Sequence, residues 1–127
     1  MPNQLSNTIG LLINNANPLP DAMLEESTPS TIAAAGTTQA TAAPIVDIVT
    51  TITNNTAANG VILPVGTGGQ SLYIIPALAT NAPLVYPPVG GTINFGTANA
   101  GVAITARKPA QFIALDSSGL NWSYGQG

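Results

Sequence analysis

Charged side chains are the first place to look for chemistry in this sequence, and it has five carboxylates, two cations, no His and no Cys. The usual transition-metal ligands, thiol nucleophiles and imidazole bases are therefore absent. Asp21, Glu25 and Glu26 fall in an irregular N-terminal stretch, whereas the acid and base of a glycosidase must be held rigidly a few ångströms apart. We expect no catalytic residue, no metal site and no cofactor, and we predict that the protein is not an enzyme.

Three short motifs point to turns and not to ligand sites. Residues 66–69 (GTGG) lack the spacing and the lysine of a phosphate-binding loop, which favours a β-turn. Residues 116–119 (DSSG) offer a single carboxylate where calcium takes six or more oxygen ligands, so we expect a hairpin turn. Arg107 and Lys108 are the only cations, too few for binding nucleic acid. They indicate either a solvated turn or an ionic contact with an acidic neighbour.

Aromatic side chains form the remaining candidate group. Trp122 and Tyr124 alternate with polar residues near the C-terminus. Such residues either stack on a sugar, together with Tyr73 here, or lie in a core or a subunit interface. Six apolar and aromatic residues are predicted to lie either in the core or in a trimer seam: Val85, Tyr86, Ile93, Phe95, Trp122 and Tyr124.

The elements that must position these residues are short β-type runs separated by Gly, Pro and Asn. They cover residues 42–53, 61–63, 72–75, 84–86, 92–95, 102–105, 111–115 and 120–124. About eight strands at roughly ten-residue spacing are typical of a sandwich or barrel. Alternation in the first run would place four residues on one face, Val46, Ile48, Thr50 and Ile52. Residues 30–43 are either a flexible linker or a first strand built of small residues. We predict an all-β domain over 30–127, a β-sandwich or jelly-roll-like domain.

Residues 1–29 differ from the rest, because Asn-Pro, Leu-Pro and Thr-Pro pairs break any long helix there. We predict an extended N-terminal arm that either docks on another protein or wraps over its own domain. The longest apolar run, 9–13, is far shorter than the ~20 residues of a membrane span, so we expect neither a signal peptide nor a membrane anchor. The apolar residues of the arm are the candidates for docking: Leu11, Leu12, Ile13, Leu19, Met23 and Leu24.

The scarcity of charge says most about the surface. Charged residues make up 6% of the chain and apolar residues 45%, whereas average soluble chains carry about 25% charged residues. Disordered chains combine high net charge with low hydrophobicity, but this chain has a net charge of -3 and many apolar residues. Obligate interfaces are depleted in Lys, Glu and Asp. We infer that other protein covers much of this surface.

Four stretches together resemble a β-domain of tailed-bacteriophage virion proteins, of the capsid decoration (cement) and head-fibre type. They are residues 35–42 (AGTTQATA), 59–64 (NGVILP), 84–94 (LVYPPVGGTIN) and 112–114 (FIA) with Trp122. The resemblance covers about residues 35–124 and rests on pattern and order. One departure is 77–83 (ALATNAP), where such domains often carry Asn and Gly. The resemblance implies a structural virion protein on the capsid exterior, with residues 1–29 adapted to a particular shell.

We therefore expect a homotrimeric cement protein whose partners are the major capsid protein and its own copies. Such a protein stabilises a shell by binding the assembled form better than its parts, and three copies would match a local three-fold axis. We expect no nucleic acid, membrane or small-molecule substrate among its partners. The alternatives are a glycan-binding fibre or adhesin module, and a structural subunit of a tail or baseplate.

Overall fold

The computed structural model describes residues 29–53, 56 and 58–127, and it forms two β-sheets that enclose one core. The five-stranded sheet has the order β1-β3-β5-β8-β9 and the four-stranded sheet the order β2-β4-β6-β7. The strands are β1 Ser30–Ala33, β2 Ala43–Pro44, β3 Val49–Thr53, β4 Gly60–Ile62, β5 Ser71–Pro76, β6 Leu84–Tyr86, β7 Val102–Ala103, β8 Ala110–Ala114 and β9 Trp122–Gln126. The predicted all-β sandwich is confirmed. Residues 1–28 of the predicted arm lie outside the described residues.

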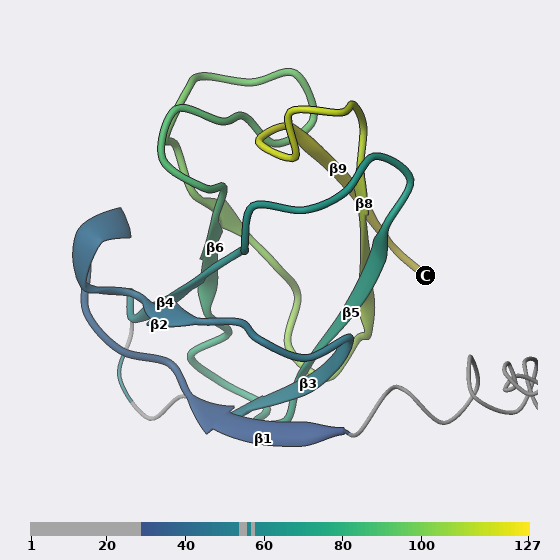
Figure 1. The fold of residues 1–127 in the computed structure, drawn as a ribbon. Coiled ribbons are helices and arrows are strands. Elements are labelled where there is room, and N and C mark those ends of the chain that lie inside the picture. The colour runs from purple at the N-terminus through teal and green to yellow at the C-terminus, as the bar shows by residue number, and fades with distance from the viewer. Residues whose placement is uncertain (1–28, 54–55, 57) are drawn as a thin grey trace, which may run out of the picture.

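The first six strands alternate between the two sheets (Figure 1). β1, β3 and β5 pair in parallel in one sheet, and β2, β4 and β6 pair in parallel in the other. Ser30 lies opposite Thr50 and Thr50 opposite Ile74, so successive circuits take 20 and then 24 residues. This half of the chain is thus a two-sheet coil, in which each strand returns beside the strand two before it.

The last three strands close the coil with antiparallel pairs. β7 pairs with β6, and β8 lies between β5 and β9. The turn between β8 and β9 covers the predicted hairpin residues, where the Gly119 N–H donates to the Asp116 carbonyl over 3.2 Å. The predicted turn at 116–119 is therefore confirmed.

The run 42–53, predicted as one strand, is two strands in different sheets. The chain crosses from β2 to β3 between them, and this crossing breaks the alternation of side chains. Val46 is 75% exposed and Ile48 37% exposed, so neither shares the buried face of Ile52. The prediction of one shared face is wrong for Val46 and Ile48, whereas Thr50 and Ile52 are both buried on one face of β3.

The run 92–95 is a turn and not the predicted strand. Asn94 and Phe95 have φ of 53° and 60°, the left-handed region, and the Gly96 N–H donates to the Ile93 carbonyl over 3.0 Å. Ile93 keeps a single bridge to Trp122. Of residues 30–43, the first four form β1, and a single-turn 3-10 helix, η1 (Gln39–Thr41), follows later.

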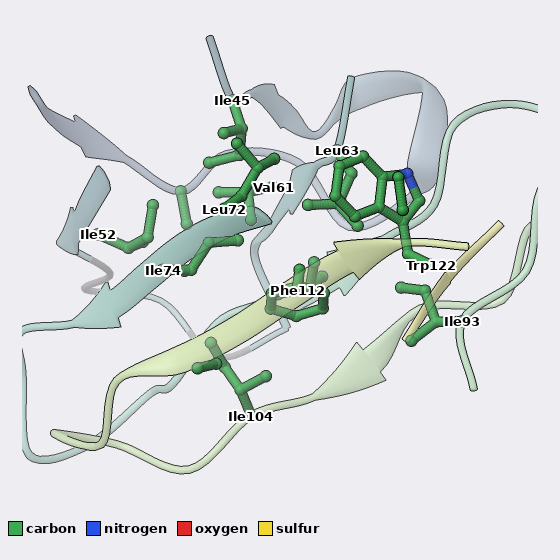
Figure 2. Close-up of a cluster of buried hydrophobic side chains, with 14 residues drawn as sticks. Ile45, Ile52, Val61, Leu63, Leu72, Ile74, Ile93, Ile104, Phe112 and Trp122 are labelled. Carbon is green, nitrogen blue, oxygen red and sulfur yellow. The ribbon is translucent and has the colours of Figure 1, made fainter. Parts of the chain in front are cut away.

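The core lies between the sheets, and strand alternation fills it. In β5, Leu72 and Ile74 point inward while Tyr73 points out, and in β8 Phe112 points inward while Ile113 points out. Full burial of such side chains contributes about 1.5–3 kcal/mol each. Figure 2 shows the cluster. Its members are Ala34, Ile45, Ile52, Val61, Leu63, Leu72, Ile74, Val85, Ile93, Ile104, Ala110, Phe112, Ala114 and Trp122.

Candidate functional site

Three loops meet at one end of the molecule, residues 64–70, 87–99 and 115–121, which we call the loop end. The Gly66 N–H donates to the Gly119 carbonyl over 2.9 Å, and the Trp122 N–H donates to the Thr92 carbonyl over 2.9 Å. At the top of Figure 1, the loop after β6 lies beside the turn between β8 and β9. Backbone hydrogen bonds between the loops therefore fix this end of the structure.

Two glycines allow the loops to approach so closely. Gly119 has φ of +72°, and a Cβ on it would collide with the backbone of Gly66. A Cβ on Gly91 would collide with the carbonyl group of Leu120. Only glycine has no side chain to place at these positions, so the local sequence itself permits the loop end to form.

An open groove of about 520 Å³ lies at the loop end and is lined by Thr92, Phe95, Leu115, Asp116 and Asn121. We call it the loop-end groove. Its apolar part is the ring of Phe95, 84% exposed, and the half-exposed Leu115. Its polar part is a carboxylate, an amide and a hydroxyl. The groove thus combines an exposed aromatic ring with hydrogen-bonding groups at close range.

The polar groups of the groove hold one another in place. Asp116 Oδ1 accepts from the Ser118 backbone N–H over 3.1 Å and from the Ser118 hydroxyl over 2.5 Å. Asp116 Oδ2 accepts from Asn121 Nδ2 over 2.9 Å. Asn121 Oδ1 in turn accepts from both the backbone N–H and the hydroxyl of Thr92, each over 3.1 Å. The carboxylate and the amide therefore have one fixed orientation.

The same hydrogen bonds favour the charged form of the carboxyl. The side-chain hydrogen bond from Asn121, followed by that from Ser118, lowers the pKa of Asp116 below its ordinary value of 3.8. The carboxyl is therefore ionised at neutral pH, and its negative charge faces the groove.

Phe95 reaches the groove from a backbone conformation that bulky residues seldom adopt. Two successive left-handed residues form its turn, and each costs about 1–3 kcal/mol. The turn is anchored through Asn94, whose side-chain oxygen accepts from the Ser123 hydroxyl and from the Tyr124 N–H, each over 2.8 Å. The surrounding structure thus holds a strained turn whose result is an exposed aromatic ring.

No family model, curated protein or solved structure matches the chain. The described residues contain no group of three His, Cys, Asp or Glu side chains placed to hold a metal ion. They also contain no helix long and apolar enough to cross a membrane.

The structure divides the residues predicted for the core or trimer seam. Val85, Ile93 and Trp122 lie in the core, and Tyr86 is also buried, with its hydroxyl donating to the Thr37 carbonyl over 3.2 Å. Tyr124 is half-buried and stacks on Phe112 with ring centroids 5.0 Å apart. Phe95 is the member that the core leaves out.

Trp122 cannot serve as a sugar platform because its side chain is 0% exposed. Figure 2 shows its ring within the cluster, beside Leu63. Its indole N–H is buried and has no acceptor among the described residues. Trp122 therefore acts here as apolar volume. The predicted docking residues of the arm lie outside the described residues.

Arg107 and Lys108 precede β8, whereas Asp116 follows it, so they lie at opposite ends of this strand. The Arg107 N–H donates to the Pro76 carbonyl over 3.0 Å, and Gln126 Nε2 donates to the Lys108 carbonyl over 2.8 Å. Both side chains are exposed, and no carboxylate of the described residues pairs with them. Both residues therefore lie on an exposed turn whose backbone is held by these two hydrogen bonds.

A second surface is the outward face of the five-stranded sheet, which we call the outer sheet face. Strand pairing places Val49 beside Tyr73 and Tyr73 beside Gln111, whose side-chain amide donates to the Tyr73 hydroxyl over 3.2 Å. The four charged residues of the described part all lie outside strands. The face consists of uncharged residues, among them Val49, Thr51, Ser71, Tyr73, Ile75, Gln111 and Ile113.

Sequence reasoning found the turn that carries Asp116 but missed Thr92, Leu115 and Asn121. Their assembly depends on contacts between loops that are distant in sequence, such as the hydrogen bonds between Thr92 and Asn121, which are 29 positions apart. One local signal was present, since Asn-Phe-Gly at 94–96 has the composition of a tight turn around an aromatic residue.

Proposed function

We propose that this protein is a structural component of a virion, a capsid decoration protein that binds the assembled head shell as a homotrimer. The outer sheet face carries this proposal. It is exposed and uncharged, with Tyr73 and Ile113 each 39% exposed. Subunit interfaces are depleted in charged residues, because burying an unpaired charge costs free energy. We place the contact between copies on this face.

Decoration of a capsid requires binding and no catalysis. A protein that binds the assembled shell but not its separate parts shifts the assembly equilibrium by mass action. The proposed contacts with the major capsid protein come from the arm, through the apolar residues Leu11, Leu12, Ile13, Leu19, Met23 and Leu24. Each apolar contact contributes about 25 cal/mol per Å² removed from water, less the entropy lost on ordering the arm.

The test is binding of purified protein to expanded shells that lack it. The proposal expects saturable binding by the full chain and loss of binding by a variant without residues 1–29. Circular dichroism of that variant checks that the β-domain is still folded. A full chain that stays in solution with the shells present contradicts the decoration role.

The mass of the full chain in solution tests the trimer separately. Light scattering at micromolar concentration should give three times the chain mass. A stable monomer contradicts the homotrimer, whatever the result with shells.

The glycan-binding alternative needs a different stacking residue, because Trp122 is buried. One observation favours it, the exposed ring of Phe95 beside a fixed carboxylate in the loop-end groove. No observation on the described residues favours the tail or baseplate alternative.

A further inference from the structure

We propose that the loop-end groove is a binding site for one ring of a neutral sugar, a pyranoside. Its ring platform is Phe95, and its hydroxyl-binding groups are Asp116, Asn121 and Thr92. The site is complete within one chain, so it does not depend on the proposed virion role.

The hydrogen-bonding groups left over in the groove match a sugar hydroxyl. A carboxylate oxygen accepts about two hydrogen bonds and an amide nitrogen donates two. Asp116 Oδ2 and Asn121 Nδ2 have used one of these on each other, so one acceptor and one donor remain side by side. A hydroxyl group both donates and accepts, and it fits this pair by donating to Asp116 and accepting from Asn121.

Thr92 supplies a third position. Its hydroxyl hydrogen is engaged with Asn121 Oδ1, which leaves the oxygen as an acceptor toward the groove. A neighbouring hydroxyl on the same ring would donate to it. Two adjacent hydroxyls of one sugar ring therefore satisfy the free groups of Thr92, Asp116 and Asn121 together.

Phe95 supplies the surface for the apolar side of the ring. The C–H groups on one face of a pyranoside pack against an aromatic ring, and Phe95 is the most exposed large hydrophobic residue of the part of the chain that the structure describes. Backbone strain of the kind seen at Phe95 is concentrated at ligand sites. The turn holds the ring exposed before any ligand arrives, so the site is already formed.

The charge of the groove sets its selectivity. Asp116 is ionised at neutral pH, since its pKa lies below the ordinary value of 3.8, and both cations of the described residues lie at the far end of β8. Acidic sugars such as sialic or glucuronic acid are therefore repelled. Neutral rings are accepted, and their binding should change little with salt because they carry no charge.

The experiment is a titration of ¹⁵N-labelled full chain with methyl glycosides of galactose, glucose and mannose, followed by NMR. We expect at least one to shift the Asn121 side-chain amide and the Phe95 backbone amide with a Kd of about 1–10 mM, because an open groove covers one side of a small ligand. Glucuronic acid and sialic acid should leave both signals in place.

Matched variants assign the site. Phe95→Ala and Asp116→Asn should each weaken binding about tenfold or more, since each removes a main contact. Phe95→Tyr keeps the platform and should keep binding. Val46→Ala removes an exposed apolar side chain between β2 and β3 and should leave binding unchanged.

Two results overturn the assignment. In the first, none of the three neutral glycosides shifts these signals at about 50 mM, above the expected Kd range. In the second, lysine methyl ester shifts them in a salt-dependent way and no glycoside does, which makes the groove a cation site. Failure of shell binding bears on the decoration role alone, because this titration uses the protein by itself.

Discussion

The two faces of the five-stranded sheet are built from the same strands, but one is buried in the core and the other faces solvent. On β8, Phe112 faces the core and is fully buried, while its neighbour Ile113 faces out and is 39% exposed. The solvated face of a sheet is commonly polar, and charged residues are mostly exposed, but the outward positions here carry only uncharged residues, several of them apolar. The inner face forms the core, whereas the outer face is uncharged and half-buried or exposed. Apolar character alone therefore does not distinguish a core from a surface in this protein.

The strongest test of this contrast is on β8. Phe112→Ala should lower the free energy of unfolding by about 3–5 kcal/mol, because it leaves a cavity in a packed core. Ile113→Ala, one residue along, should lower it by about 0.5 kcal/mol or less. Urea denaturation of the monomeric state measures both. Equal losses would mean that the two faces contribute alike to the fold.

The second prediction compares an exposed side chain at the loop end with the buried side chains of the core. Phe95→Gly should raise the free energy of unfolding by about 0.5–1 kcal/mol, because glycine removes the left-handed strain at a position that buries little. Phe95→Ala keeps the strain and serves as the control, with no such gain expected. Thermal denaturation compares the two. A loss of stability in the glycine variant would show that the exposed ring supports the fold.

The third prediction separates association from folding on the outer sheet face. Ile113→Lys should change the free energy of unfolding by about 0.5 kcal/mol or less and should abolish the trimer, because the proposed contact would bury the added charge. Ala79→Lys adds the same charge at an exposed position in the loop between β5 and β6. Light scattering of both variants gives the mass. A trimeric Ile113→Lys variant would move the contact to another surface.

The smallest expected effect is on pH dependence. The pKa of Asp116 is lowered in the folded state, so its ionised form adds stability above the unfolded pKa of about 3.8. That stability is lost as the pH falls through the lower folded pKa. Compared with Asp116→Asn, the wild type should lose its advantage in Tm between about pH 5 and pH 2. A constant difference over this range would mean that ionisation of Asp116 is not coupled to folding.

Much of the fold followed from local pattern. The runs 84–86 and 111–115 coincide closely with β6 and β8, because β-branched and aromatic residues at alternate positions favour a half-buried strand whatever its partner. The turn at 116–119 also followed from its Asp and Gly. Of the loop-end groove, only Phe95 and the Asp116 turn were singled out in advance, one as core or seam and the other as a turn.

The wrong prediction at Val46 and Ile48 and the choice left open between core and seam for the aromatic residues have one cause. Val46 and Ile48 alternate like strand residues, but the chain changes sheets at that point. Phe95 and Trp122 are both large aromatics within an alternating pattern, yet one is 84% exposed and the other fully buried. Periodicity fixes which side chains point the same way within a run, and it carries no information on which run lies opposite.

The sequence by itself determined the all-β character, the turn chemistry and the absence of His and Cys from every possible site. The tertiary structure decided that strands return in parallel through alternate sheets, that Trp122 fills the core and that Phe95 stands beside Asp116 and Asn121. The physical reason is the separation along the sequence over which each effect acts. Propensities and turns act over a few residues, whereas burial depends on packing between segments 20 or more residues apart, and only the folded chain brings these together.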